Sequence, residues 1–84
     1  MSKANERVRK AILEVVDNQL RDRNPPATKE TFDRLVGEGF SQDEARRLIG
    51  CVVGSEIFAV LESLQPYDEG RYLTALKNLP ELPE

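Results

Sequence analysis

Histidine is absent from this sequence of 84 residues, and cysteine occurs only once, as Cys51. The missing histidine removes the commonest general base, the commonest metal ligand and the side chain that changes charge near physiological pH. A single cysteine can form neither an intrachain disulfide nor a structural zinc site. We therefore expect no catalytic site, no metal and no cofactor, and a protein of the cytoplasm, where disulfides are rare.

Long hydrophobic runs are also missing. No stretch approaches the roughly 20 consecutive apolar residues that cross a bilayer. The first ten residues are polar, unlike those of a signal peptide. Glycine-rich phosphate-binding loops and the G-x-S-x-G turn of hydrolases do not occur. We expect a protein that is not an enzyme and has no membrane partner.

Apolar residues make up 39% of the sequence and charged residues 32%, which suits a small core with a well-solvated surface. Strand-like alternation does not appear, whereas apolar residues recur every three or four positions in four segments, as in amphipathic helices. The pattern predicts helices at residues 4–23, 28–38, 42–64 and 69–78, followed by a short tail at 79–84. We predict one all-α domain, a compact four-helix fold with a long central third helix.

Local signals mark the helix boundaries. The stretch 24–26, Asn-Pro-Pro, ends the first helix because a residue before proline avoids the α conformation. Gly39 suits the left-handed position after the second helix. Ser41 and Glu44 fit a capping box that starts the third helix at residue 42. Asp68 fits an N-cap of the fourth helix.

The third segment is apolar around most of its circumference, which predicts a central helix. Gly50 and Gly54 each lower its propensity by about 1 kcal/mol relative to alanine. A break near Gly54 is the alternative to one continuous helix, which the four-residue spacing favours. The two glycines also form a G-x-x-x-G pattern where another helix, from this chain or a second copy, comes close. Between them, we predict that Cys51 is a buried, small apolar residue.

Charge is distributed unevenly along the chain. Residues 1–29 carry seven basic and four acidic side chains, a net +3, and the remainder carries five basic and eleven acidic, a net −6. One interpretation is that these charges orient the first helix against an acidic remainder. The alternative is a basic strip for nucleic acid, which acidic residues interrupt and no aromatic residue accompanies, so nucleic acid is the less favoured partner. The strip would consist of Arg7, Arg9, Lys10, Arg21 and Arg23.

Two polar residues interrupt the apolar faces. Gln19 lies in the stripe of the first helix and Glu56 in the middle of the apolar face of the third. A buried carboxylate needs partners, and Arg71, Arg46 or a tyrosine hydroxyl could supply them. The favoured interpretation is a satisfied polar pair or ion pair. The alternative is a small polar pocket or ligand site that includes Gln19, Asn18 and Glu56.

The third helix has more apolar surface than its own core needs. A chain of 84 residues forms a core of marginal stability, and self-association would bury the surplus. We predict an interface for a protein partner, or for a second copy in a homodimer. Its candidate residues are Phe40, Ile57, Phe58 and Leu61.

The stretches DNQ at 17–19, NPP at 24–26, DEARRLIG at 43–50 and EIF at 56–58 resemble a family of small uncharacterised bacterial helical proteins. The similarity extends over residues 15 to 80, and the family is a domain of unknown function. Many members carry histidines where this chain has Asp43 and Arg47. The resemblance implies a small helical fold, and it implies that any metal or catalytic role of those histidines is not retained here.

A second resemblance concerns residues 35–41, LVGEGFS, which are similar to the helix–turn–helix of ubiquitin-associated domains. Those domains bind protein partners through the glycine–phenylalanine turn. The following helix is too long for that three-helix module, and a glycine C-cap followed by a capping box accounts for the same pattern. Taken together, the sequence predicts a non-enzymatic domain for protein–protein contact or self-association.

Overall fold

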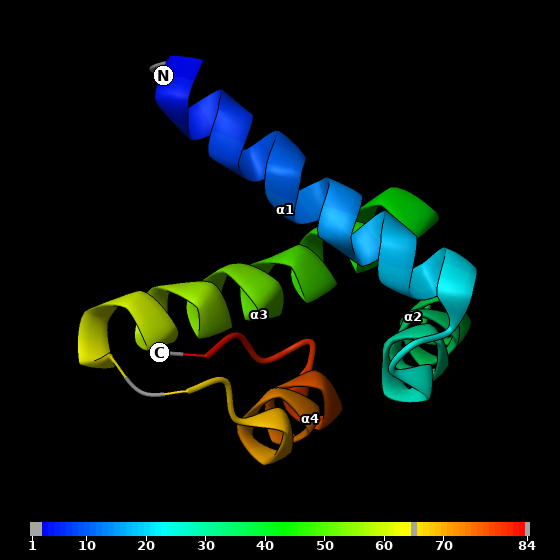
Figure 1. Cartoon of the computed structure of the whole chain (residues 1–84). Coiled ribbons are helices and arrows are strands. Elements are labelled where there is room, and N and C mark those ends of the chain that lie inside the picture. Colours follow the sequence, from blue (N-terminus) through cyan, green and yellow to red (C-terminus); the bar gives the residue numbers. More distant parts are fainter. Residues whose placement is uncertain (1–2, 65, 84) are drawn as a thin grey trace.

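Four helices form the chain in the computed structural model, which describes residues 3–64 and 66–83 and the side chains from residue 5 onward. They are α1 (Lys3–Asp22), α2 (Pro26–Gly37), α3 (Gln42–Ser63) and α4 (Glu69–Asn78), and no strand occurs in the described ranges. Figure 1 shows α1 crossing α3, with α2 next to the C-terminal end of α1 and α4 on the side of α3 that is opposite α1. The all-α four-helix prediction is confirmed.

Both ends of α4 and the start of α3 are as predicted, and the other helix ends differ from the prediction by one or two residues. α2 begins at Pro26 rather than residue 28, because proline has no amide hydrogen to lose and its fixed φ suits the first turn. Arg23 and Leu64 have φ values of 51° and 56°, so both lie outside the helices that the sequence extended over them. Residue 84 of the predicted tail lies outside the described residues, and Leu79 is buried.

The caps are as predicted. Gly39 has φ 105° after α2. Ser41 Oγ accepts from the Glu44 amide at 3.0 Å, and the Glu44 carboxylate accepts from the Ser41 amide at 2.9 Å. The Asp68 side chain accepts from the Arg71 amide at 3.0 Å. These bonds satisfy amides at the helix N-termini, so the starts of α3 and α4 are fixed locally.

α3 is the central element, continuous through Gly54, and it packs against α1, α2 and α4. Its buried side chains meet Val16 of α1, Leu35 of α2 and Leu76 of α4 in one core. A Cβ on Gly50 would lie 3.5 Å from the Ile12 and Leu13 side chains, and one on Gly54 would lie 3.2 Å from Ile12. The helix that approaches the G-x-x-x-G pattern is therefore α1 of the same chain.

Candidate functional site

Gln19 lies in a hydrogen-bonded cluster with Thr28 and Tyr72. Its Oε1 atom accepts from the hydroxyls of Thr28 and Tyr72, both at 2.8 Å. Thr28 and Tyr72 are buried, and burial raises the pKa of Tyr72. A tyrosine hydroxyl was among the partners that the sequence analysis expected for the buried polar residues. Thr28 was not, because the sequence predicted only a helix start at that position. Asn18 is exposed, because it points about 100° away from its neighbour Gln19 on the helix. The prediction that Asn18 belongs to the polar cluster was therefore wrong.

Glu56 is 8% exposed and forms an ion pair with Arg71. The Arg71 guanidinium donates to both carboxylate oxygens, at 2.6 and 2.9 Å, and the Asp68 amide donates at 3.4 Å. These hydrogen bonds, from Arg71 above all, lower the pKa of Glu56 although burial opposes them. The predicted partner Arg71 is confirmed; Arg46 instead pairs with Asp17.

Gln19 and Glu56 also line one cavity of about 340 Å³ between α1, α3 and the start of α4. Its walls are apolar apart from these two residues and the tyrosines Tyr67 and Tyr72. No buried side-chain nitrogen or oxygen among the described residues lacks a hydrogen-bond partner. Gln19 and Glu56 therefore stabilise the fold, Gln19 through Thr28 and Tyr72 and Glu56 through Arg71.

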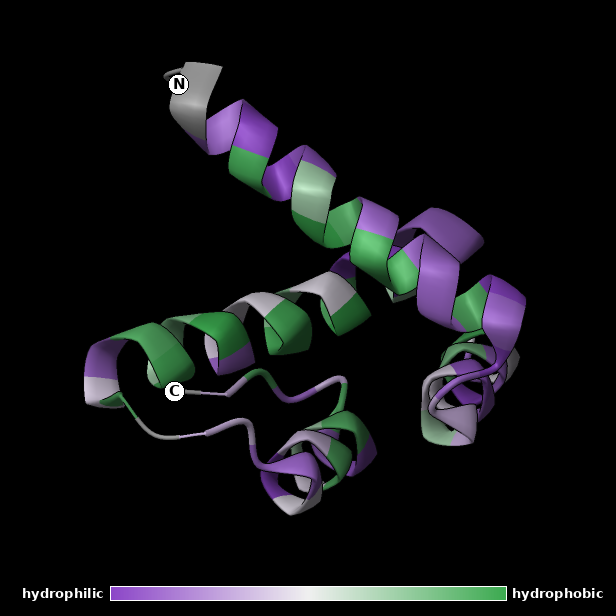
Figure 2. Ribbon diagram, in the orientation of Figure 1, coloured by the Kyte–Doolittle hydropathy of each residue, from purple (hydrophilic) through white to green (hydrophobic). Residues whose placement is uncertain are grey.

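An apolar hollow of about 360 Å³ continues from this cavity between the two longest helices, and we call it the α1–α3 notch. The notch shares Val15, Ile57 and Leu61 with the cavity. Figure 2 shows hydrophobic residues on the side of α1 that faces α3 and along the C-terminal half of α3. The lining residues are Val8, Ala11, Ile12, Val15, Gly54, Ile57, Phe58 and Leu61.

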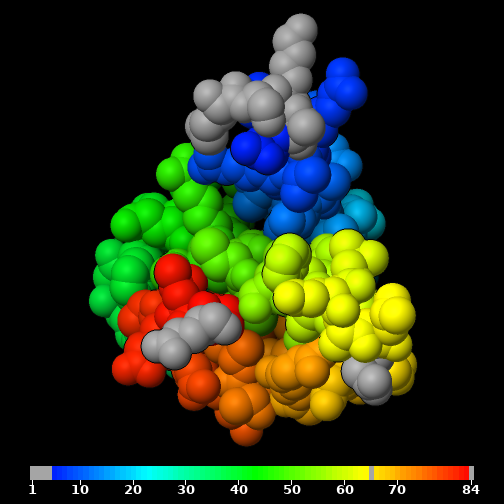
Figure 3. Space-filling model, turned by 90° about the vertical axis from the view of Figure 1, so that its left-hand side faces the viewer, coloured from blue at the N-terminus to red at the C-terminus, as the bar shows by residue number. Residues whose placement is uncertain are grey.

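The notch remains open because its two walls diverge. Figure 3 views the molecule from the side where both walls end, with α1 in blue above the yellow C-terminal half of α3. Val8 is 58% exposed, Phe58 65% and Leu61 71%. These large apolar side chains therefore share one open surface instead of lying scattered.

The predicted interface residues Ile57, Phe58 and Leu61 lie together in the notch, but Phe40 does not. Phe40 is partly buried against the core, because its amide bonds to the Leu35 carbonyl and folds the turn back onto α2. Sequence reasoning did not single out Val8 as part of this surface. The signal was the position of Val8, four residues before Ile12, which is the residue that meets Gly54.

Cys51 is exposed rather than buried as predicted. α1 approaches α3 on the side of Gly50 and Gly54, so Cys51 lies at the edge of that contact in an open groove with Arg9 and Arg47. Among the residues that the structure describes, no cluster of three potential ligands could hold a metal ion, and no helix has the length and apolar character to cross a membrane.

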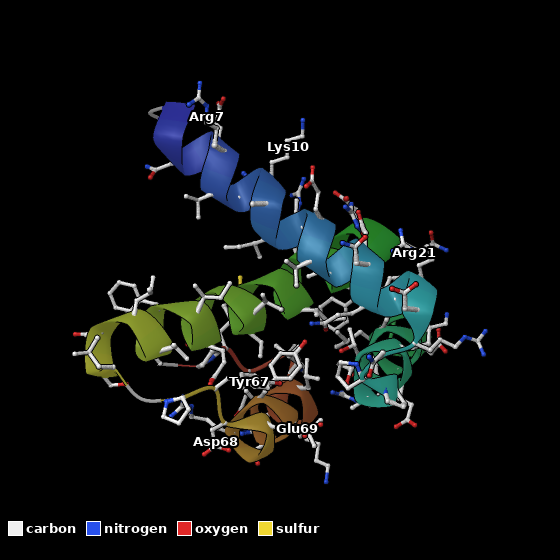
Figure 4. The ribbon with its side chains drawn as sticks, viewed as in Figure 1. Arg7, Lys10, Arg21, Tyr67, Asp68 and Glu69 are labelled. Carbon is white, nitrogen blue, oxygen red and sulfur yellow. The ribbon has the colours of Figure 1, made fainter. Side chains whose placement is uncertain are left out.

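The candidate basic residues do not form one continuous strip. Arg7, Arg9 and Lys10 are exposed near the start of α1 and form no ion pair with any described residue. Arg21, near the other end of α1, pairs with Asp22 at 3.0 Å, and Arg23 lies beyond the helix. Figure 4 shows Arg7 and Lys10 on the side of α1 that points away from α3, and Asp68 and Glu69 at the start of α4.

Comparison with known proteins identifies no relative. No protein-family model, curated protein or solved structure matches this chain. The resemblances to small bacterial helical proteins and to ubiquitin-associated domains therefore remain predictions.

Proposed function

We propose that this protein is a non-enzymatic, self-associating domain whose homodimer forms through the α1–α3 notch. The observation that carries the proposal is the open apolar surface of that notch, where Val8, Phe58 and Leu61 are each more than half exposed. Contiguous exposed apolar surface on a small protein marks a contact site. Grooves between helices commonly bind an amphipathic helix of a partner.

The polar groups beside the notch support a binding role over catalysis. The Glu56 carboxylate is already paired with Arg71, and Gln19 Oε1 already accepts two hydrogen bonds. A general base needs a free, suitably placed acceptor. These two candidates are instead engaged in holding α1, α3 and α4 together.

A second copy is the partner that fits best. One wall of the notch belongs to the basic N-terminal part of the chain, which is +3 over residues 1–29, and the other wall belongs to the remainder, which is −6. Closed symmetric dimers use the same patch on both subunits, so that patch must be complementary to itself. A patch whose two apolar walls belong to oppositely charged parts of the chain meets that requirement.

The test is the molar mass in solution, measured by light scattering for three variants beside the original protein. We expect a dimer for the original protein and monomers for Phe58→Asp and Leu61→Asp, because an aspartate in the contact would be buried without a partner. Leu82→Asp is the matched control, since Leu82 is 52% exposed and lies outside the notch. It should remain dimeric.

Folding of each variant is checked by circular dichroism. Phe58 and Leu61 are mostly exposed, so their replacement should leave the helical spectrum of the monomer intact. Dimers of unchanged stability in both notch variants would contradict the proposal.

A further inference from the structure

We infer that in the dimer the N-terminal part of α1 from one copy lies antiparallel along the C-terminal part of α3 from the other, held by apolar contact and opposite charge. The inference rests on the proposed function and specifies which surfaces meet. We call residues 5–12 the basic arm, and residues 54–63 with 66–69 the acidic arm.

The two arms match in length. Val8 and Val15 mark the ends of the apolar stripe of α1, and Gly54 and Leu61 mark the ends of the stripe of α3. Each pair is separated by seven residues, or about 10.5 Å along a helix. Two stripes of equal length with side chains every three or four residues can pack into each other's grooves.

The arms carry opposite charge. The basic arm contains Arg7, Arg9 and Lys10 against Glu6 alone, whereas the acidic arm contains four carboxylates and no basic residue. No lysine or arginine occurs between Arg47 and Arg71. Of these carboxylates only Glu56 has an ion-pair partner among the described residues, and the three bases of the basic arm have none. Arg7 and Lys10 point away from α3 (Figure 4), so they attract the acidic arm of a second copy over a distance and not by direct pairing.

The antiparallel direction follows from the helix termini. The N-terminus of a helix carries partial positive charge and the C-terminus partial negative charge. The last turn of α3 contains no basic residue that would offset its negative end. An antiparallel arrangement brings the start of α1 from one copy to the end of α3 of the other. Pairing α1 with α1 would instead bring six bases together, three from each copy.

The experiment reverses the charge of the basic arm in one variant and removes the net charge of the acidic arm in another. Variant A carries Arg7→Glu and Lys10→Glu, so both of its arms are acidic; variant B carries Glu62→Lys and Glu69→Lys, so its former acidic arm holds two lysines and two carboxylates and has no net charge. The four residues are exposed, and none of them lines the notch. We expect the dissociation constant of each variant alone to rise by about tenfold or more, since each symmetric contact of A exchanges an attraction for a repulsion and each contact of B loses its attraction.

An equal mixture of A and B provides the decisive result. In the mixed dimer the substituted basic arm of A, now acidic, meets the substituted acidic arm of B. The native basic arm of B meets the native acidic arm of A. We therefore expect A and B to form a heterodimer that is tighter than either homodimer at low salt and weakens as salt increases, because one of its two contacts is native. The control variant, Arg21→Glu with Lys77→Glu, changes the net charge as A does but outside both arms, and it should dimerise normally.

The outcomes separate the inference from the proposed function. If the original protein dimerises and Leu61→Asp abolishes the dimer, but A and B dimerise unchanged, the inference is wrong and the notch remains the interface. If A is weakened and B is not, α1 contacts something other than the acidic arm, which also overturns the inference. If the original protein is monomeric throughout, the proposed function itself fails.

Discussion

Glu56 is a carboxylate in the middle of the apolar face of α3, and its environment shows two opposing effects. Burial favours the neutral form and would raise the pKa, whereas the hydrogen bonds from Arg71 favour the charged form. The second effect is larger, so the pKa of Glu56 is lowered. Folding therefore favours the ionised carboxylate.

The stabilising contribution of this ion pair should depend on pH. A carboxylate whose pKa is lower in the folded state stabilises the protein above its unfolded pKa, about 4.3 for glutamate, and loses this effect as the pH falls through the folded value. We expect Glu56→Gln to reduce the free energy of unfolding by about 1–2 kcal/mol at neutral pH. In urea denaturation, the difference between the two proteins should shrink in acid; a constant difference would contradict this account.

The Gln19 cluster gives a second prediction at this scale. Tyr72→Phe removes one of two hydroxyl donors from Gln19 Oε1 but leaves the ring in the core. We expect a loss of about 0.5–1.5 kcal/mol in the free energy of unfolding, the usual net value of one hydrogen bond. Tyr67→Phe is the control, because Tyr67 is 54% exposed and its hydroxyl has no partner among the described residues. Equal effects of the two substitutions would argue against a structural role for the cluster.

At the scale of single elements, the start of α3 depends on its capping box. Ser41→Ala removes the acceptor for the Glu44 amide, so thermal or urea unfolding should show a loss of about 1 kcal/mol. Ser55→Ala, an exposed position inside the same helix, should have little effect or stabilise slightly, because alanine has the higher helix propensity. A neutral Ser41→Ala would show that the box is dispensable.

The crossing of α1 over α3 depends on Gly50. An alanine Cβ there would be in ordinary contact with Ile12 and Leu13 at 3.5 Å, so we expect Gly50→Ala to stabilise the protein by up to about 1 kcal/mol through helix propensity. Gly50→Leu should destabilise it by about 1–3 kcal/mol, because the larger side chain would displace α1. Denaturation curves of the two variants should therefore shift in opposite directions. Shifts in the same direction would show that α1 does not pack as closely as described.

The helices and caps could be predicted because their signals are local. The capping box lies within four adjacent residues, and the period of the apolar residues reports helical faces directly. The residues against which a helix face packs come from distant parts of the sequence, so no local signal identifies them. Val8 and Val16 belong to the same stripe of α1, yet Val16 is fully buried and Val8 is 58% exposed, because α1 extends past its crossing with α3. Cys51 was predicted incorrectly because the sequence did not show that α1 contacts α3 on the side of Gly50 and Gly54.

At the scale of the whole molecule, the notch leaves apolar surface open in a domain that has little stability to spare. Short chains bury a smaller fraction of their surface than long ones, and a dimer adds burial that depends on concentration. We expect the melting temperature of the original protein to rise with protein concentration and that of Leu61→Asp to stay constant. Differential scanning calorimetry over a wide concentration range checks this. A concentration-independent melting temperature for both proteins would exclude a dimer coupled to folding.

The molar mass of the original protein, followed by light scattering over a concentration series in moderate salt, tests the central claim most directly. Self-association through the notch predicts a mass that rises smoothly from that of one chain to twice that value and then stays there, since a closed two-fold contact leaves no free interface. A mass equal to that of one chain at every concentration would contradict the claim.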